Sequence, residues 1–303
     1  MSIEIKNISH SYSKGTIQAL KDVSLSIKPG ERFGIIGPDG AGKTSLFRIL
    51  TTLLLADNGS AVVCGYDVVK DYKAIRSICG YMPGKFSLYY DLSIQENLNF
   101  FARVFGTSFE ANRHLVEEIY VQLEPFKDRP AGKLSGGMKQ KLALCCALIH
   151  EPKVLFLDEP TTGVDPVSRR EFWDMLDRLK SRNITILVST PYMDEASRCD
   201  RIALMQDGKI LAVDSLEGII ANYDKKLWSV KTQHTNAVLK KLKIHPEVAS
   251  SIPFGDSIHI RMKNQLATFE DVRITMANMD DSLTVAPLVP EIEDVFMDLM
   301  SAQ

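Results

Sequence analysis

The sequence has 303 residues, enough for one large domain or two ordinary ones. Apolar residues make up 45% of it and charged residues 24%, which is ordinary for a soluble globular protein that buries a core. The net charge of −2 provides no overall field to attract nucleic acid, so a nucleic-acid partner, which would need a local basic patch, is not expected. No apolar run approaches the roughly 18–20 residues that cross a bilayer, so any membrane role must come through another protein.

The start of the chain and its cysteines indicate a reducing compartment. Residues 1–6 alternate between apolar and polar side chains, which predicts an edge strand and not a secretory signal. The five cysteines form no C-x-x-C pair and lie beside no histidine cluster, which argues against a disulfide framework and against a zinc site. We therefore expect a cytoplasmic protein.

A complete phosphate-binding loop follows these first strands. Residues 37–44 match the pattern G-x-x-x-x-G-K-[ST], between a short buried strand over residues 32–37 and a helix over residues 45–50. The glycines allow backbone N–H groups to point at phosphate oxygens, and the helix N-terminus adds partial positive charge. Lys43 is expected to reach the β- and γ-phosphates of a nucleoside triphosphate, and the Thr44 hydroxyl to hold Mg²⁺. The residues expected to bind nucleotide here are Gly37, Pro38, Asp39, Gly40, Ala41, Gly42, Lys43, Thr44 and Ser45.

Residues 93–150 are predicted to be helical. Ser93 followed by Glu96 forms a capping box at the start of the first helix. The apolar spacing predicts a second helix over residues 112–126 and a third over residues 138–149. This helical block differs from residues 1–80, which are predicted to form short strands and turns around the phosphate loop.

The last of these helices begins with a second anion-binding pattern. Ser135 is a natural N-cap, and Gly136 and Gly137 leave the first backbone amides open. One chain rarely needs two phosphate-binding surfaces for a single γ-phosphate. We therefore expect this surface to serve a nucleotide that is held by a different molecule.

Two carboxylates end a buried strand over residues 154–157. Such a strand end places Asp158 and Glu159 at the carboxyl edge of a sheet, where phosphates bind. Asp158 is expected to hold Mg²⁺, and Glu159 to act as general base toward the attacking water. Strands and helices alternate from residue 153 to residue 207, which implies a parallel sheet covered on both faces.

The character changes again near residues 218–226. The domains are predicted as an ATP-binding domain over residues 1–220, with a helical subdomain at about 85–150, and an accessory α/β domain over residues 221–303. The accessory domain is predicted to hold strands over 227–232 and 257–262 and helices over 237–242, 269–279 and 291–300.

These motifs resemble, in order and spacing, those of the ATP-binding subunits of ABC transporters. The similarity covers residue 1 to about residue 220. It identifies residues 134–140 (LSGGMKQ) as the signature segment, 154–159 as the Walker B strand, and 163–166 as a loop that touches the partner across a dimer. Tyr12 matches the aromatic residue that stacks on adenine, although an ordinary strand aromatic would look the same.

The resemblance implies an α/β fold of the P-loop NTPase type. A mostly parallel core sheet is expected beside an antiparallel β subdomain and a helical subdomain, with a small C-terminal α/β unit. Residues 290–299 are similar to the ending of drug-resistance and multidrug-type exporter subunits, although an amphipathic closing helix would also explain them.

The resemblance also implies a mechanism. Two such domains, identical or different, dock head to tail and hold two ATP molecules, each between the phosphate loop of one subunit and Ser135, Gly136 and Gly137 of the other. Closure pulls on an integral-membrane permease and hydrolysis releases it. The chain is thus expected to power an exporter from the inner face of the membrane. Residues 86–90 are expected to contact the permease, with packing between subdomains as the alternative.

Two residues depart from the family pattern. Gly84 stands where a glutamine normally contacts Mg²⁺ and water, and Pro191 stands where a histidine normally bonds the γ-phosphate. Glycine has no side chain for that task, and proline lacks even a backbone donor. We expect nucleotide binding to survive and turnover at this chain's own site to be slowed.

Two other function classes remain open from the sequence. A soluble ABC ATPase of translation or DNA repair is one, although neither a second ATP domain nor a coiled-coil or zinc insertion is visible. A regulatory nucleotide-binding module that hardly hydrolyses is the other, and Gly84 and Pro191 are its support. The transported molecule is not encoded in an ATPase subunit that does not touch it.

Overall fold

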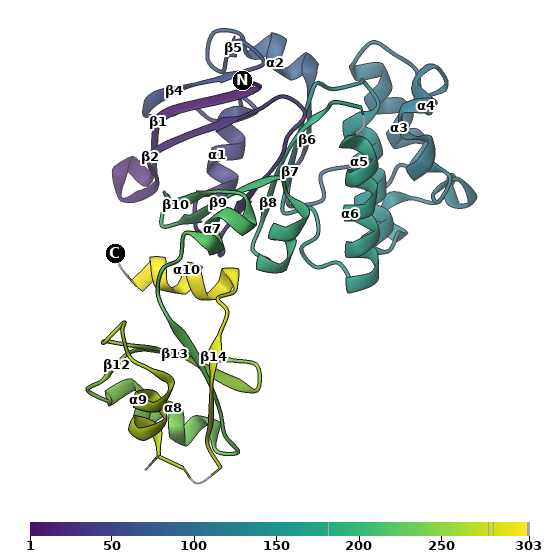
Figure 1. Cartoon of the computed structure of the whole chain (residues 1–303). Helices are drawn as coiled ribbons and strands as arrows, with labels where there is room; N and C mark the ends of the chain where they lie inside the picture. The colour runs from purple at the N-terminus through teal and green to yellow at the C-terminus, as the bar shows by residue number, and fades with distance from the viewer. Residues whose placement is uncertain (181, 278, 281, 302–303) are drawn as a thin grey trace. The chain divides into compact units, whose positions relative to one another are not determined.

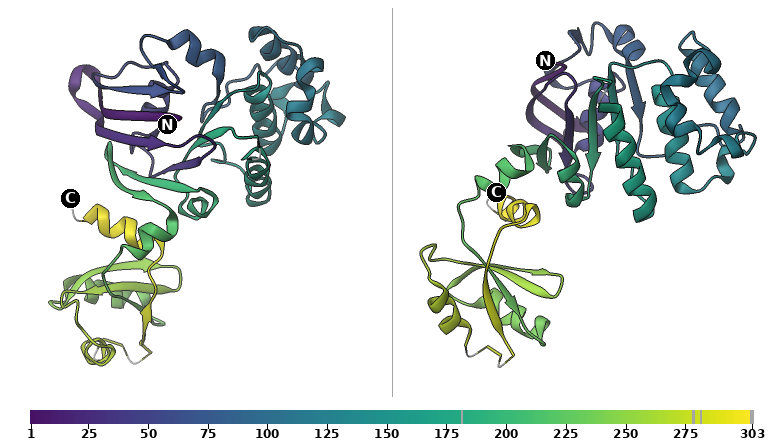
Figure 2. Two further views of the ribbon diagram at one scale, coloured as in Figure 1. Left: turned by 45° about the horizontal axis from the view of Figure 1, so that its top comes forward. Right: turned by 45° about the vertical axis from the view of Figure 1, so that its right-hand side comes forward.

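The computed structural model describes residues 1–180, 182–277, 279–280 and 282–301. These residues form two compact units, Met1–Leu216 and Glu217–Gln303 (Figures 1 and 2). In the part of the chain that is described, no helix combines the length and the apolar character needed to cross a membrane.

A six-stranded sheet forms the centre of the first unit. The strand order is β10-β9-β3-β8-β7-β6, and every neighbouring pair is parallel except β10 with β9. This arrangement confirms the predicted parallel core sheet. The strands are β3 (Arg32–Ile36), β6 (Cys79–Met82), β7 (Val154–Asp158), β8 (Thr185–Thr190), β9 (Arg201–Gln206) and β10 (Lys209–Asp214).

Helices cover both faces of this sheet, as Figure 1 shows. Alternate residues of a strand point to opposite faces. Val154 and Phe156 of β7 join the apolar cluster that contains helix α1 (Lys43–Leu50). Leu155 and Leu157 join the cluster that contains α5 (Gly136–Leu148) and α6 (Pro166–Lys180). Helices α1 and α5 therefore lie on opposite faces of one sheet.

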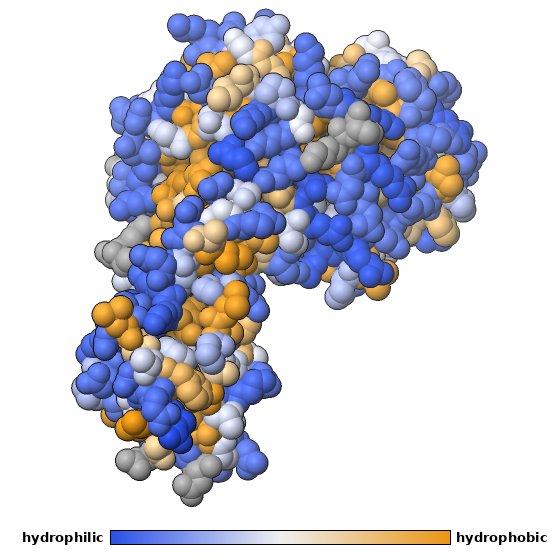
Figure 3. Space-filling view, viewed as in Figure 1, coloured by the Kyte–Doolittle hydropathy of each residue, from blue (hydrophilic) through white to orange (hydrophobic). Residues whose placement is uncertain are grey.

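Helix α6 shows how the sequence pattern produces this packing. Its apolar residues recur at helical spacing and are buried, among them Phe172, Leu176 and Leu179. Charged residues occupy its other side, and hydrophilic side chains predominate over α5 and α6 on the face shown in Figure 3. The helix is thus held by one apolar stripe against the sheet.

An antiparallel sheet with the order β2-β1-β4-β5 lies beside the core sheet in this unit. Residues 1–6 were predicted as an edge strand, and this is wrong, because β1 pairs with β2 on one side and with β4 on the other. Ile3, Ile5 and Ile8 are buried and anchor the strand in the α1 cluster. The strands are β1 (Ile3–Tyr12), β2 (Ile17–Ile27), β4 (Asn58–Val63) and β5 (Tyr66–Asp67).

The helical part begins with the predicted capping box. Ser93 accepts from the N–H of Glu96, and the Glu96 carboxylate accepts from the N–H of Ser93. The predicted helix over 112–126 is shifted toward the N-terminus. Ser108 caps it, so it starts at Phe109, and it ends at Tyr120, before Pro125, which lacks the N–H that a helix interior needs. The helical elements of the unit, besides α1, α5 and α6, are η1 (Ser13–Gly15), α2 (Tyr72–Ile78), α3 (Ile94–Val104), α4 (Phe109–Tyr120), η2 (Glu124–Phe126), η3 (Ala131–Lys133) and η4 (Met193–Arg198).

The second unit is an antiparallel sheet with helices. Its strand order is β12-β13-β11-β14, and α8 and α9 pack on one face around Val230, Ile258 and Ile260. Strands β12 and β14 were not predicted, since their residues are largely half-buried or exposed and show no clear alternation. The elements are α7 (Leu216–Ala221), β11 (Leu227–Lys231), α8 (Thr235–Ile244), β12 (Val248–Phe254), β13 (Ser257–Met262), α9 (Phe269–Met276), β14 (Thr284–Leu288) and α10 (Ile292–Ser301).

Candidate nucleotide-binding site

The phosphate-binding loop connects β3 to α1, as its motif requires. Gly42 is the residue before the helix, with φ of +107°, and Gly40 has φ of +81°. Both values lie in the left-handed region, which glycine adopts without a steric penalty. Gly37 is needed for another reason, because a Cβ there would lie 2.0 Å from the backbone oxygen of Met205 in β9. The loop is therefore packed directly against the sheet edge.

This close approach makes Gly37→Ala a test of the loop geometry. The new methyl group would collide with a backbone atom that no side-chain rotation can move away. We expect a loss of about 1–3 kcal/mol in the free energy of unfolding, together with weaker nucleotide binding. Gly136→Ala is the control, because a Cβ there meets only the carbonyl oxygen of Gly163 among the described atoms within 4 Å, at an ordinary contact distance of 3.8 Å, and Gly136 is not among the glycines with positive φ. Denaturant unfolding and nucleotide titration compare them, and equal losses would contradict the packing argument.

Lys43 is buried inside this loop, with 3% of its surface exposed. Its Nζ donates to the carbonyl oxygens of Gly37 at 2.7 Å and of Pro38 at 2.9 Å. It also lies 3.0 Å from Oε1 of Glu159. The ammonium group is thus positioned between the loop and the residue that follows β7, although Lys43 and Glu159 are 116 residues apart in the chain.

Asp158 and Thr44 come together at the same place. Thr44 Oγ1 donates to Asp158 Oδ1 at 3.2 Å, and Ser189 Oγ donates to the same oxygen at 2.6 Å. Burial raises the pKa of the Asp158 carboxyl, and the two hydroxyl donors oppose that shift. A hydroxyl and a carboxylate with adjacent oxygens are the donor set that Mg²⁺ takes beside phosphates, so these two residues fit the ion.

Glu159 has an unusual backbone conformation. Its φ is +51°, in the left-handed region that is costly for a residue with a side chain. Its N–H donates to the Ser189 carbonyl at 3.1 Å and to Ser189 Oγ at 3.0 Å. The surrounding structure therefore holds the main chain of Glu159 in place and directs its carboxylate toward Lys43.

Tyr12 lies at the edge of this arrangement. Its hydroxyl is 3.1 Å from the hydroxyl of Ser45, in the first turn of α1. The end of β1 and the start of α1 are thus neighbours, although 33 residues separate the two side chains in the sequence. Tyr12 is accordingly close to the loop whose nucleotide it is expected to contact.

Both departures from the family pattern also lie beside the site. A Cβ on Gly84 would be 3.1 Å from the backbone oxygen of Asp158 and 3.8 Å from Cβ of Glu159. Pro191 directly follows Thr190, the last residue of β8. The chain therefore has the expected positions, without the side chains that the family places there.

The second anion-binding pattern is formed at the start of α5. Ser135 is the N-cap, and its hydroxyl accepts from the N–H of Met138 at 3.3 Å. A Cβ on Gly136 would lie 3.8 Å from the carbonyl oxygen of Gly163, and one on Gly137 would collide with Ser168. The signature segment is therefore next to residues 163–166, the other stretch expected at a dimer interface. It lies on the face of the sheet opposite to α1.

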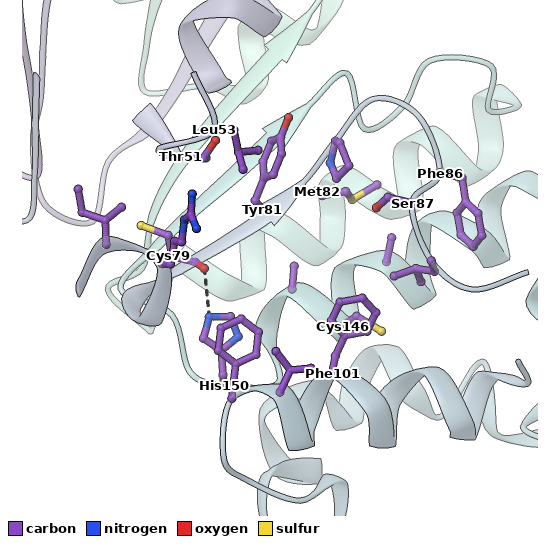
Figure 4. A pocket seen from close by; sticks show the side chains of 18 of the residues that line it. Thr51, Leu53, Cys79, Tyr81, Met82, Phe86, Ser87, Phe101, Cys146 and His150 are labelled. Atoms are coloured by element: carbon purple, nitrogen blue, oxygen red, sulfur yellow. Dashed lines mark hydrogen bonds between the residues drawn. The ribbon is translucent and has the colours of Figure 1, made fainter. Parts of the chain in front are cut away.

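An apolar groove of about 410 Å³ lies between β6, α3 and α5. Figure 4 shows Phe86 and Ser87 at one end of it and Cys79 and His150 at the other. His150 stacks on Phe105 with ring centroids 3.6 Å apart, and its Nε2 is 3.1 Å from the carbonyl oxygen of Cys79. Burial lowers the pKa of His150. Phe86 and Ser87 belong to the stretch expected to contact a permease.

Sequence reasoning missed the residues that support the carboxylates. Ser189 contacts both Asp158 and the main chain of Glu159, and Thr161 and Thr190 both bond to Glu195. The only available signal was position, since Ser189 and Thr190 end a buried strand that is parallel to β7.

Comparison with known proteins agrees with this geometry. The ABC transporter family model matches residues 20–162. The chain is 40% identical over 286 residues to the probable multidrug ABC transporter ATP-binding protein YbhF of Escherichia coli K12, covering 93% of this chain and 49% of that protein. It therefore spans about half the length of this relative.

Two further similarities cover more of the other protein. Over 221 residues the chain is 39% identical to the Nod factor export ATP-binding protein I of Burkholderia orbicola, and this covers 72% of each chain. The dimeric structure of a post-hydrolysis state of the ATP-binding cassette MJ0796, bound to ADP and Pi, matches with a TM-score of 0.64 and 27% identity, covering 71% of this chain and 98% of that one. The chain therefore belongs to the ABC transporter ATPase family, among relatives of the multidrug and export type.

Proposed function

We propose that this chain binds and hydrolyses ATP to drive an exporter whose permease is a separate membrane protein. Residues 1–220 act as the ATP-binding domain, and residues 221–303 as an accessory domain. The observation that carries the proposal is the meeting of the phosphate loop with the end of β7, where Lys43 contacts Glu159 and Thr44 contacts Asp158. Relatives named as multidrug and Nod factor export proteins support the direction of transport.

Each residue of this meeting point has a role in the proposal. The loop amides of residues 37–44 and Lys43 bind the phosphates, and Tyr12 stacks on the adenine. Thr44 and Asp158 hold Mg²⁺, which when bound neutralises phosphate charge. Glu159 accepts the proton of the attacking water. The nucleotide displaces Lys43 from its carbonyl partners, because the ammonium group prefers phosphate oxygens.

Lys43→Ala tests the binding step. Removing the ammonium group should weaken ATP affinity by about tenfold, the effect of losing roughly one charge-assisted hydrogen bond of 1.4 kcal/mol or more. Lys6→Ala is the matched control, since Lys6 is exposed and pairs only with Glu4 among its described contacts. Titration with a fluorescent ATP analogue measures both. A wild-type chain without affinity at millimolar Mg·ATP would overturn the proposed function.

A second ATP-binding subunit is part of the proposal. Because α1 and α5 cover opposite faces of the sheet, one nucleotide on the phosphate loop is expected to meet the signature residues of another molecule. Ser135, Gly136 and Gly137 then contact the nucleotide of the partner. The two subunits are either two copies of this chain or this chain with a different one. Isolation of a stable, active homodimer from cells would argue against the mixed pair.

The permease is proposed to contact the region of Phe86. The apolar groove beside Phe86 and Ser87 offers a concave surface that a permease segment could fill (Figure 4). Tyr89 and Tyr90 follow it and are about half exposed, at 50% and 52%. This contact would hold the chain at the inner face of the membrane. Co-purification with an integral-membrane protein, lost in a Tyr89→Ala, Tyr90→Ala variant, is the expected result.

A further inference from the structure

Glu195 is a buried carboxylate between two segments of the candidate site. Only 3% of its surface is exposed. Its Oε1 accepts a hydrogen bond from Thr161 Oγ1 at 2.8 Å, and its Oε2 accepts one from Thr190 Oγ1 at 2.5 Å. Thr161 follows β7 in the chain, and Thr190 ends β8. One side chain from η4 thus joins the ends of both strands.

Each of the two threonines is next in sequence to a residue that bonds to the main chain of Glu159. Thr161 lies two residues after Glu159 in a turn closed by the bond from the Thr162 N–H to the Glu159 carbonyl at 3.2 Å. Thr190 follows Ser189, which accepts the N–H of Glu159. Since Glu159 has the costly φ of +51°, its orientation depends on neighbours that fix both segments.

The charge of Glu195 is balanced locally. A buried carboxylate is costly unless it is hydrogen-bonded and paired. Besides the two hydroxyls, Nε of Arg169 lies 3.8 Å from Oε1, and Arg169 also contacts Asp194 at 3.1 Å. The Arg169 guanidinium lies over the ring of Tyr192, 4.5 Å from its centroid. Arg169 belongs to α6, which starts at Pro166, the last residue of the stretch 163–166.

We propose that Glu195 is a positioning residue for hydrolysis. Glu195 links the turn that contains Glu159 and Thr161 to Thr190 at the end of β8, and so holds that turn in place. This support matters in a chain where Pro191 provides no side-chain donor for the γ-phosphate. Glu195 acts through its hydrogen bonds with Thr161 and Thr190. The inference rests on the proposed function of this site and adds a residue on which its turnover depends.

Isosteric substitutions test this directly. Thr161→Val and Thr190→Val remove one hydroxyl each at nearly constant volume, whereas Thr161→Ser and Thr190→Ser keep it. We expect kcat to fall about 10- to 100-fold in the valine variants, as for small misplacements in an active site. The serine variants should retain wild-type turnover. ATP affinity should stay within about twofold in all four, because the phosphate loop is unchanged.

Glu195→Gln gives a second measurement that does not depend on the valine variants folding. The amide can accept only one of the two threonine hydroxyl bonds and carries no charge for Arg169. In the double variant Thr161→Val, Glu195→Gln, the loss of kcat should be smaller than the sum of the two single losses in free energy, because both substitutions affect the same hydrogen bond between Thr161 and Glu195. Additive losses, or valine variants as fast as the serine variants, would overturn the role of Glu195. A loss of ATP affinity in parallel with the loss of kcat would also overturn this role, because it would show that the substitutions loosen the whole site.

A different result would contradict the proposed function itself. It fails if wild type shows no turnover above that of Lys43→Ala, which would overturn the role of Glu195 as well. Wild-type turnover that is unaffected by all the Thr161, Thr190 and Glu195 substitutions overturns only the positioning role.

Discussion

Glu159→Gln should lower the steady-state rate of ATP hydrolysis by about 10²- to 10⁴-fold while leaving ATP affinity nearly unchanged. The amide has the size of the carboxylate but cannot accept a proton from water at neutral pH. Its oxygen can still accept from Lys43, which is 3.0 Å from Oε1 of Glu159, so the loop should keep its conformation. Phosphate release and nucleotide titration measure the two quantities separately.

The control for this substitution is Glu110→Gln, the same change on the exposed surface of α4. It should leave both turnover and affinity at wild-type values. A Glu159→Gln variant that hydrolyses as fast as the control would exclude Glu159 as the base. A variant that loses affinity as well would show that the carboxylate mainly supports the loop through Lys43.

The phosphate site could be predicted because its determinants are local. The glycine spacing of residues 37–44 depends on backbone conformations that neighbouring residues create, and the strand and helix around it have clear patterns. Asp158 and Glu159 could be placed near it because parallel strands end at the same edge of a sheet. The structure shows both carboxylates in contact with residues of that loop.

Most of the supporting contacts could not be predicted, because they join residues far apart in the chain. Thr161 and Glu195 are separated by 34 positions, and neither belongs to a motif with a physical signature. A buried glutamate also contradicts the usual expectation that Glu is exposed. The pairing of β7 with β8 in register, with Asp158 opposite Ser189, brings these segments together.

The closing helix shows a similar limit. Residues 291–300 read as an amphipathic helix, which predicts an apolar buried side and a polar exposed side. In α10 the carboxylates of Asp294 and Asp298 are buried, with 5% and 8% exposed. Asp294 lies 2.7 Å from Nδ1 of His259, and Asp298 lies 3.1 Å from the guanidinium of Arg261. Strand β13 supplies these partners, so the polar side of the helix is also packed.

Gly84 and Pro191, the two departures from the family pattern, lie beside the candidate site but outside the motif of its phosphate loop. We expect the double variant Gly84→Gln, Pro191→His to raise kcat by up to about 10²-fold, the size of the positioning loss that the two departures imply. Glutamine would add a polar side chain beside Asp158, where the new Cβ needs the main chain to shift by a few tenths of an ångström from 3.1 Å. Histidine would restore both a backbone N–H and a side-chain donor for the γ-phosphate.

The double variant Gly84→Ala, Pro191→Ala is the control. It shows whether a gain in kcat comes from the new polar side chains or from removing the proline ring alone. It adds the same Cβ at position 84 and removes the proline ring, without either polar group, so its kcat should stay near the wild-type value. Steady-state phosphate release at saturating Mg·ATP measures all three proteins. If wild type already turns over as fast as the double variant, the two departures are tolerated, because Lys43, Asp158 and a Glu159 held by Ser189 are then enough to position the water.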